Sequence, residues 1–345
     1  MLPKIAIVIL NWNGKKFLED FLPSVIKYSI NDAEIIIADN ASEDGSIDYL
    51  KNNFPNIRII KNKINEGFSK GYNDALKQVE ADYYILLNSD IEVTDNWINP
   101  VIKLMENDKK IAACQPKIKS YNNPEKFEYA GAAGGYIDKY GYPFCRGRLF
   151  QTIEKDNKQY DDVVEVFWAS GACMFVRADL YHKYGGLDND FFAHMEEIDF
   201  CWRLKNEGYK IMFCPYSTVY HIGGGTLPKS SSRKTYLNFR NNLTLLYKNL
   251  PKNRLFKTFC ARLFLDGAAA FKFLLQGGFK DFIAVNRAHF SFYRNFSKIK
   301  QKRNQLKQNK VSMIYNSNIA YDYFIKRKKY FFELNSDKFE IKTII

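Results

Sequence analysis

The sequence predicts an α/β fold with a mostly parallel central sheet, followed by a helical, basic C-terminal region. Up to about residue 115, runs rich in β-branched residues alternate with runs of helical periodicity, as in right-handed β–α–β units. From Tyr236 the pattern is helical, with apolar residues at helical spacing until Pro251 ends the run. At 345 residues the chain can hold two units. We expect an α/β domain over residues 1–230 and a helical region over residues 231–345.

The elements of the first unit follow in order from local pattern. Lys4–Leu10 is a continuous apolar run, typical of a strand buried on both faces of a parallel sheet. Residues 116–180 are less regular, and we expect long loops and edge strands there. The other predicted elements are a helix at Lys15–Tyr28, a strand at Glu34–Ala38, a helix at Ser46–Asn53, a strand at Ile57–Lys61, a helix at Ser69–Val79 and a strand at Tyr83–Leu87.

Charge is distributed unevenly along the chain. Residues 1–225 hold 26 Lys and Arg against 32 Asp and Glu, a net charge of −6. Residues 226–345 hold 25 against 6, a net charge of +19, which brings the total to +13. An acidic first part and a strongly basic second part indicate two roles on one chain.

Several protein classes are excluded by composition and spacing. Six cysteines without any C-x-x-C pair fit neither a zinc knuckle nor a disulfide framework. The N-terminal apolar run, Ile5–Leu10, is too short for a signal peptide. The longest uncharged stretch, Ile211–Pro228, contains Pro215 and three consecutive glycines, so it does not form a membrane-spanning helix. We expect a cytoplasmic protein.

Polar and small residues follow each of the first four predicted strands. In open α/β sheets, ligands bind beyond the carboxyl ends of the strands, so these residues are expected to line one crevice. They are Asn11 and Asn13 after the first strand, Asp39, Asn40 and Ser42 after the second, Asn65, Gly67, Phe68 and Asn73 after the third, and Asn88, Ser89 and Asp90 after the fourth.

The crevice residues fit a nucleotide diphosphate held with a divalent cation. Neither G-x-G-x-x-G after the first strand nor a P-loop motif is present, which excludes the usual dinucleotide and P-loop sites. Asp39 can accept a hydrogen bond from a pyrimidine or a ribose hydroxyl, and Gly67 allows close backbone approach. Asp90 can bind Mg²⁺ or Mn²⁺, which prefer oxygen ligands. Taken alone, each of these aspartates can equally cap a helix or a turn. The prediction therefore depends on polar and small residues following all four strands.

A second cluster of charge lies on one predicted helix, where three carboxylates follow Phe191 and Phe192. Burying carboxylates beside aromatic rings is costly, which favours a catalytic base at Glu196 or Glu197. Asp199 and Arg203 stand four residues apart, and we interpret them mainly as a structural pair.

A third feature runs from His221 through three glycines to Thr226, with basic residues close behind. A histidine and a glycine hinge can complete a metal site and close over a diphosphate. The alternative is a strand end followed by a linker.

Seven stretches resemble, in chain order, the motifs of family-2 inverting glycosyltransferases of the GT-A fold, and the bacterial rhamnosyltransferase-like branch is the most similar. They cover roughly residues 3–245 and are Ile7–Gly14, Ile36–Ser42, Asn65–Asn73, Leu86–Asp90, Gly171–Arg177, Gly185–Arg203 and His221–Thr226.

The resemblance implies transfer of a sugar from a nucleotide-diphosphate donor, with dTDP-rhamnose first, to a hydroxyl of a glycan or lipid-linked glycan. It implies that Asp39 contacts the base, that Asp90 and His221 bind Mg²⁺ or Mn²⁺, and that Glu197 or Glu196 is the base. It places Gly171, Trp168, Asp199 and Thr226 in loops on the acceptor side. The sequence departs from the family at Asn88-Ser89-Asp90, which holds one acid, and at Glu196-Glu197, where the usual base is Asp.

Two other functions stay open at this point. A sugar nucleotidyltransferase uses a similar crevice, but the chain has no clear basic, glycine-rich triphosphate loop near its start. A nucleic-acid binder is suggested by the basic run Lys298–Arg303, although nothing there resembles a readout module and we expect no nucleic-acid partner.

The basic region between Leu255 and Phe296 interleaves phenylalanines with lysines and arginines. Lys272 and Lys280 interrupt every apolar stretch, so no part of it spans a bilayer. Aromatic and basic residues on one helix suit the interfacial plane of an anionic membrane. The alternative is a helical subdomain packed on the core. We predict a peripheral protein on the inner face of the cytoplasmic membrane.

Overall fold

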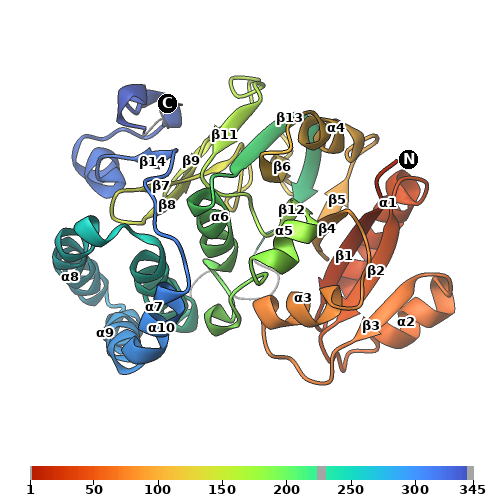
Figure 1. Ribbon diagram of the computed structural model, residues 1–345, viewed down its shortest axis with the longest axis horizontal. Coiled ribbons are helices and arrows are strands. Elements are labelled where there is room, and N and C mark those ends of the chain that lie inside the picture. The colour runs from red at the N-terminus through yellow and green to blue at the C-terminus, as the bar shows by residue number, and fades with distance from the viewer. Residues whose placement is uncertain (1, 224–230, 340–345) are drawn as a thin grey trace.

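The computed structural model describes residues 2–223 and 231–339, and within them a nine-stranded sheet forms the centre of the molecule (Figure 1). Its strand order is β11-β13-β6-β12-β4-β1-β2-β3, with β5 paired to β13. The strands are β1 (Ile5–Asn11), β2 (Glu34–Asp39), β3 (Arg58–Lys61), β4 (Tyr83–Asn88), β5 (Ile91–Val93), β6 (Ile111–Ser120), β11 (Val164–Val166), β12 (Cys173–Arg177) and β13 (Lys210–His221).

Most strands of this sheet run in one direction, as predicted. β3, β2, β1 and β4 are successively parallel, and β6 and β13 are parallel to each other. β12 lies between β4 and β6 and is antiparallel to both, so β6 and β13 run in the same direction as β4. Only β5, β11 and β12 of these described strands run the other way. The predicted fold class is confirmed.

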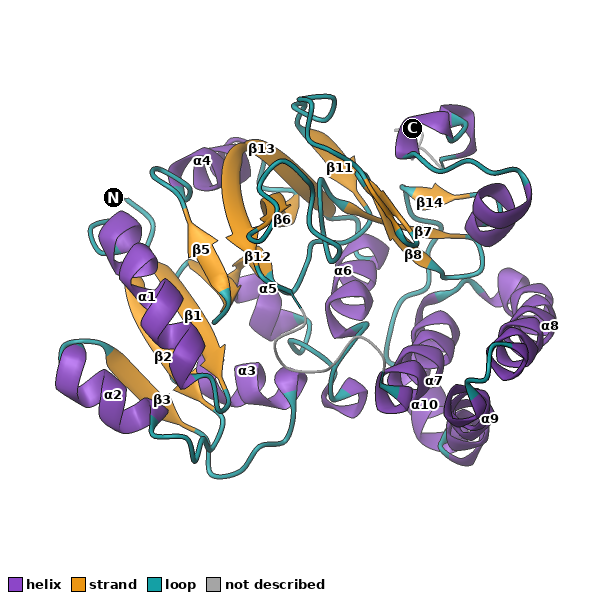
Figure 2. Cartoon of the chain, turned by 180° about the vertical axis from the view of Figure 1, so that it is seen from behind, coloured by secondary structure: helices purple, strands orange, loops and turns teal. Residues whose placement is uncertain are grey.

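β1 separates two hydrophobic cores, which explains its continuous apolar sequence. Alternate residues face opposite sides of a strand. Ala6 and Val8 join one core, whereas Ile5, Ile7 and Ile9 join the other. Figure 2 shows helices on both faces of the sheet. The helices that contribute to the first core include α3 (Phe68–Leu76), α5 (Ala178–Lys183), α6 (Glu196–Asn206) and α7 (Ser232–Asn249), and those of the second include α1 (Lys15–Ser29), α2 (Ser46–Asn53) and α4 (Asn99–Asn107).

The expectation of loops and edge strands over residues 116–180 is wrong for two strands. β6 and β12 lie in the middle of the main sheet. Within this region β11 is an edge strand of the main sheet, as expected, and β7 to β10 form a second sheet of order β10-β9-β8-β7-β14. Its strands are β7 (Gly135–Asp138), β8 (Pro143–Cys145), β9 (Arg148–Leu149), β10 (Thr152–Ile153) and β14 (Ile314–Tyr315). β12 is a five-residue run with four buried residues, and such a run has the same pattern in a parallel and in an antiparallel strand, so periodicity alone does not place it.

The C-terminal region is mainly helical, and its end returns to the first unit. β14 pairs with β7, so residues beyond the helices complete the second sheet. No helix among the described residues has an apolar stretch long enough to cross a bilayer. The helices are α7 (Ser232–Asn249), α8 (Lys252–Leu275), α9 (Phe279–Arg294) and α10 (Phe296–Asn304), followed by short helical turns at Tyr321–Ile325, Phe331–Glu333 and Ser336–Lys338.

Candidate active site

Asn11, Asp39 and Ser42 form one hydrogen-bonded group at the carboxyl ends of β1 and β2. Asn11 Nδ2 donates to Asp39 Oδ1 at 3.2 Å and to Ser42 Oγ at 3.1 Å. The Ser42 N–H donates to Asp39 Oδ2 at 3.0 Å, and the Asn13 N–H donates to Ser42 Oγ at 2.9 Å. Asn11 Oδ1 is buried without a hydrogen-bond partner among the described residues. An unpartnered buried acceptor at a strand end is a place for a ligand donor.

Asn40, Asn65 and Gly67 extend this edge toward β3. Asn65 Oδ1 accepts from Asn40 Nδ2 at 2.8 Å and from the Gly67 N–H at 2.9 Å. Gly67 has a φ of +92°, and a Cβ there would lie 2.6 Å from the ring of Phe192. The N–H of Phe68 donates to the Phe192 carbonyl at 2.8 Å. Only glycine allows this contact, which joins the loop before α3 to the loop before α6.

Both polar atoms of the Asn73 side-chain amide are already hydrogen-bonded within the protein. Its Nδ2 donates to the Leu187 carbonyl at 2.6 Å and to Asn189 Oδ1 at 2.7 Å. Its Oδ1 accepts from the Tyr181 hydroxyl at 2.7 Å. The amide therefore ties α3 to residues 187–189, and this structural use replaces the nucleotide contact that we expected.

Asp90 and His221 meet beside the end of β4. Asn88 pairs with Leu10 of β1, so Asn88 and Ser89 place Asp90 at the same sheet edge as Asn11. His221 ends β13, and its Nε2 lies 3.1 Å from Asp90 Oδ1. On the other side of the ring, Nδ1 lies 3.5 Å from Glu128 Oε2. The sequence did not indicate Glu128, because it lies in an irregular segment without a recognisable motif.

The two carboxylates control the charge of this histidine. Burial acts to lower the pKa of His221, but hydrogen bonds and ion pairing with Asp90 and Glu128 raise it to about 10. Burial acts to raise the pKa of Asp90 and of Glu128, but the bonds from His221 hold both below their usual values. The two carboxylates therefore favour the protonated form of the imidazole, and a cation that binds Nε2 would displace that proton.

Asp90 and His221 fit as two ligands of a divalent cation, whose other ligands would come from substrate and water. The described residues contain no set of three His, Cys, Asp or Glu side chains arranged to hold a metal on their own. Asp90 and His221 nevertheless direct one oxygen and one nitrogen toward each other, a donor pair that Mn²⁺ and Mg²⁺ accept. Glu128 behind Nδ1 would fix the ring with Nε2 toward the cation.

Glu196 and Glu197 begin α6, after two residues in left-handed conformation, His194 at φ 69° and Met195 at φ 75°. Glu196 is buried and Glu197 is half-buried. The Oε2 atom of each lacks a hydrogen-bond partner among the described residues. Burial raises the pKa of both carboxyl groups, and the nearby Glu197 raises that of Glu196 further. Two carboxylates without a structural partner have the properties of a proton acceptor.

Gly171 links this pair to the donor edge. A Cβ added to Gly171 would lie 3.5 Å from the Phe68 ring and 3.7 Å from Glu197 Cβ. Phe68 begins α3 directly after Gly67. Gly171 therefore lies between the Glu197 side chain and Phe68, the first residue of α3, and its lack of a side chain leaves the space between them open.

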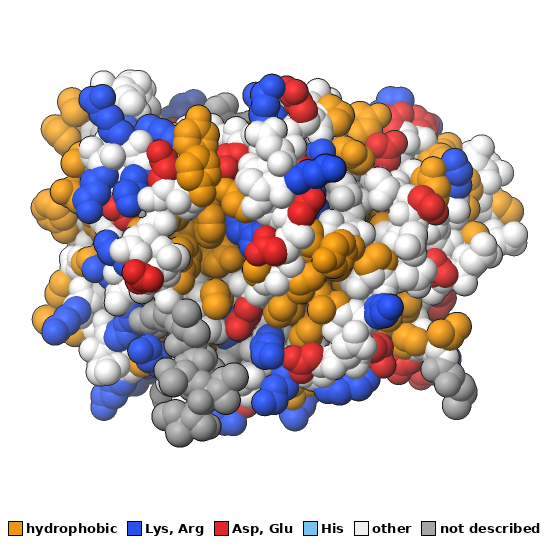
Figure 3. Space-filling model, turned by 90° about the horizontal axis from the view of Figure 1, so that it is seen from above, with side chains coloured by type: hydrophobic (Ala, Val, Ile, Leu, Met, Phe, Trp, Pro, Cys, Tyr) orange, Lys and Arg blue, Asp and Glu red, His pale blue; other side chains and the backbone are white. Residues whose placement is uncertain are grey.

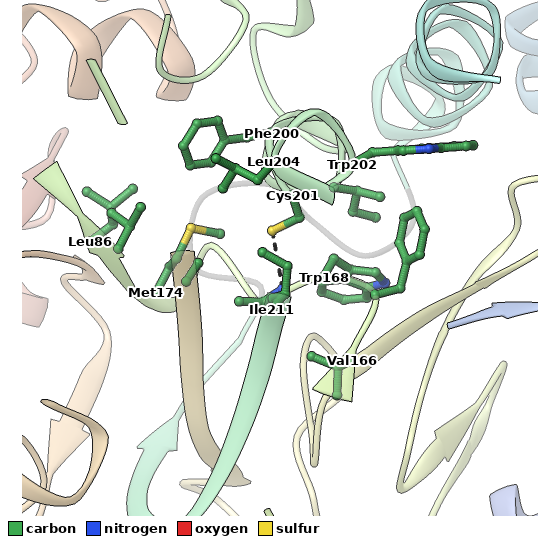
Figure 4. Packing of buried hydrophobic residues seen from close by; sticks show 14 of the residues in the cluster. Leu86, Val166, Trp168, Met174, Phe200, Cys201, Trp202, Leu204 and Ile211 are labelled. Atoms are coloured by element: carbon green, nitrogen blue, oxygen red, sulfur yellow. Dashed lines mark hydrogen bonds between the residues drawn. The ribbon is translucent and has the colours of Figure 1, made fainter. Parts of the chain in front are cut away.

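Two of the other residues expected on the acceptor side, Asp199 and Trp168, have structural partners. Asp199 is fully buried, where it pairs with Arg203 and Lys248, each at 2.8 Å, so it is structural. Trp168 is also buried and donates its indole N–H to the Tyr136 carbonyl at 3.0 Å. Thr226 lies outside the described residues. Figure 4 shows Trp168 below α6, where Cys201 faces the Ala169 N–H. These side chains hold α6 on the sheet.

Comparisons with known proteins identify the family of the chain. A family model described as glycosyl transferase family 2 matches residues 6–185. An N-acetylglucosaminyl-diphospho-decaprenol L-rhamnosyltransferase of Mycobacterium tuberculosis is 24% identical over 235 residues, which are 63% of this chain and 75% of the relative. The rhamnosyltransferase WbbL of Escherichia coli is 25% identical over 145 residues, 42% of this chain and 54% of WbbL.

The fold has solved relatives as well. A structure of GalNAc-T7 with UDP, GalNAc and Mn²⁺ superposes with a TM-score of 0.56 at 18% identity. The match covers 73% of this chain and 49% of that protein. At this identity the likeness concerns the fold.

Proposed function

Because the chain belongs to glycosyl transferase family 2 and is a glycosyltransferase, we propose that it moves a sugar from a nucleotide-diphosphate donor to a hydroxyl of a lipid-linked glycan, with inversion. The observation that carries this proposal is the pairing of two sites across Gly171. On one side lies the hydrogen-bonded edge of β1, β2 and β4. On the other lie Glu196, which is buried, and Glu197, which is half-buried, each with an Oε2 atom that lacks a hydrogen-bond partner among the described residues.

The donor would bind along the carboxyl edge of the sheet. Asp39 and Asn11 offer acceptors to the base or ribose, and Asn65 holds the loop with Gly67 close to the substrate. The rhamnosyltransferases among the relatives support dTDP-rhamnose as the donor to test first.

Asp90 and His221 would hold Mn²⁺ or Mg²⁺, as the Mn²⁺ in the GalNAc-T7 structure supports. A bound cation of this kind stabilises the charge of a leaving diphosphate. The chain's own contribution is to hold the two ligands at the sheet edge, with Glu128 fixing the orientation of the imidazole.

Glu197 would act as general base. It is half-buried, whereas Glu196 is buried, so Glu197 is the more accessible of the two to an acceptor hydroxyl. It would take the proton of that hydroxyl as the oxygen attacks the anomeric carbon and the bond to the nucleoside diphosphate breaks. A negative charge on Glu197 raises the pKa of the neighbouring Glu196, so the two carboxyl groups do not readily ionise together.

Exposed apolar side chains of the C-terminal helices support a lipid-linked acceptor. On α8, Phe256, Phe264, Phe271 and Leu275 are 57–80% exposed. Lys and Arg side chains gather toward the left of Figure 3, the side on which α8 lies in Figure 1. An apolar and basic helix face suits an anionic membrane surface, where a lipid-linked acceptor resides. We therefore place the working enzyme at the inner face of the cytoplasmic membrane.

Calorimetry with the purified chain tests the donor. dTDP-, UDP- and GDP-sugars are titrated with and without Mn²⁺, and the released product is identified. We expect one donor to bind with Mn²⁺ and a nucleoside diphosphate to be released on transfer. Release of pyrophosphate would instead identify a nucleotidyltransferase.

A further inference from the structure

A basic cavity lies between α7 and α9, outside the donor edge. Its volume is about 510 Å³, and four cationic side chains line it. Arg233 and Arg240 come from α7, whereas Lys280 and Arg287 come from α9. No acidic residue lines this cavity.

The positive charge of this cavity is not neutralised by the protein. None of the four cations makes a salt bridge to a carboxylate within residues 2–223 and 231–339. A second cavity provides the contrast, because its Lys248 and Lys302 both pair with Asp188. Four cations that face one volume without a carboxylate partner create a positive potential that attracts an anion.

Aromatic rings and backbone carbonyls hold the three arginines of this cavity in place. The guanidinium of Arg233 lies 5.1 Å from the centre of the Phe192 ring, and that of Arg287 lies 5.8 Å from the centre of the Tyr236 ring. Arg240 Nη2 donates to the Phe191 carbonyl at 2.9 Å. Guanidinium groups oriented in this way suit bidentate contacts to phosphate oxygens.

The cavity adjoins both the proposed active site and an apolar surface. Phe192 lines the cavity and also contacts Gly67 of the donor loop. Ile283 lines the cavity and is 39% exposed, and Phe279, one residue before Lys280, is 60% exposed. A ligand with a charged group and an apolar chain can therefore place one in the cavity and the other on α9.

We infer that this cavity binds the diphosphate of a prenyl-diphosphate-linked acceptor, with the prenyl chain leaving over Phe279 and Ile283. The inference rests on the proposed function and adds the site by which the acceptor is held. The shared chemistry is a diphosphate, which a free anion or the nucleotide donor also carries, so the test separates these sources.

The test measures binding of farnesyl diphosphate and of inorganic pyrophosphate to the full chain without added divalent cation. The cavity variant carries Arg233→Gln, Lys280→Gln and Arg287→Gln. These side chains are exposed, so the fold is expected to persist, and the thermal midpoint checks this. The control variant carries Lys257→Gln, Arg294→Gln and Lys300→Gln, which removes the same charge from α8, α9 and α10 but touches no residue of the cavity.

We expect farnesyl diphosphate to bind about tenfold more weakly to the cavity variant and within about twofold of wild type to the control. Excess UDP or dTDP should not displace it. Equal binding by both variants, displacement by the nucleotide, or pyrophosphate binding as tightly as farnesyl diphosphate would each overturn the inference. Nucleotide-sugar binding in the presence of Mn²⁺, measured on the same variants, reports on the proposed function separately.

Discussion

Glu197, like its neighbour Glu196, has a buried carboxylate oxygen without a hydrogen-bond partner among the described residues. Asp199, two residues along the same helix, is more deeply buried but is paired with Arg203 and Lys248. The sequence predicted both the glutamate pair and the structural character of Asp199 with Arg203. It did not predict that the Asn73 side chain forms hydrogen bonds with Tyr181 and Leu187, because those residues stand more than 100 positions away. Partners at such distances are set by the fold and leave no local pattern.

Glu197→Gln should remove sugar transfer and leave donor binding intact. The amide keeps the shape of the carboxylate but cannot accept the proton, so we expect kcat to fall by about 10²- to 10⁴-fold. Calorimetry should give a donor Kd within about twofold of wild type. Glu196→Gln is the matched variant, and transfer that survives Glu197→Gln but not Glu196→Gln would move the base one residue upstream.

The pH profile follows from the same burial. A general base works only when deprotonated, and burial raises the pKa of Glu197. Activity should therefore be complete at high pH and fall as the pH drops through a value above about 4.3, the ordinary value for Glu. The profile of kcat/KM on the wild-type chain measures this, and a rate that stays level down to pH ~4.5 would contradict it.

At the scale of elements, the sequence located β1–β4 and their helices to within a few residues but not the centre of the sheet. The first strands carry long β-branched runs and are joined by helices, which defines their order and direction. β12 is short and mostly buried, and its antiparallel place between β4 and β6 depends on pairing with strands far along the chain. The second sheet was not predicted, because its strands are two to four residues long.

α8 is held to α7 and α9 by one buried charged group. Arg262 bonds Asp266 at 3.0 Å, and Asp266 also bonds His289 of α9 at 3.0 Å. Arg262 donates to Asn242 of α7 as well. This group explains how a helix with exposed aromatics keeps a fixed position on the core.

Asp266→Ala should destabilise the protein, because it leaves Arg262 buried without its carboxylate. We expect a loss of about 3–5 kcal/mol in the free energy of unfolding. Urea unfolding followed by circular dichroism measures it. Asp20→Ala, which breaks an exposed pair with Lys16, is the control and should change the value by less than about 1 kcal/mol. Similar small losses for both variants would refute the role of this group.

At the scale of the whole molecule, the acidic first part holds the proposed active site and the basic second part holds the helices that carry exposed aromatics. The family that the sequence predicted is confirmed, and the division into two units stays a prediction. It did not show that the chain returns to pair β14 with β7, so removing residues after 250 would also damage the second sheet. Point substitutions on α8 therefore test membrane binding better than truncation does.

Vesicle co-sedimentation of the full chain should show binding that rises with anionic lipid. Each basic residue near such a surface contributes about 1 kcal/mol, and inserted aromatics add to this. The variant Phe264→Ser, Phe271→Ser, Leu275→Ser should lose most of the binding while keeping its circular dichroism spectrum. Equally small binding of wild type to anionic and to neutral vesicles would exclude the membrane surface as a partner.

The stereochemistry of the product tests the central claim most directly. With the donor identified by calorimetry and a short-chain lipid-linked glycan that accepts the sugar, nuclear magnetic resonance of the first product gives the configuration at the transferred anomeric carbon. Direct attack by a hydroxyl that Glu197 deprotonates predicts a configuration opposite to that of the donor. A product that keeps the donor's configuration would contradict the single-displacement account built on Glu197.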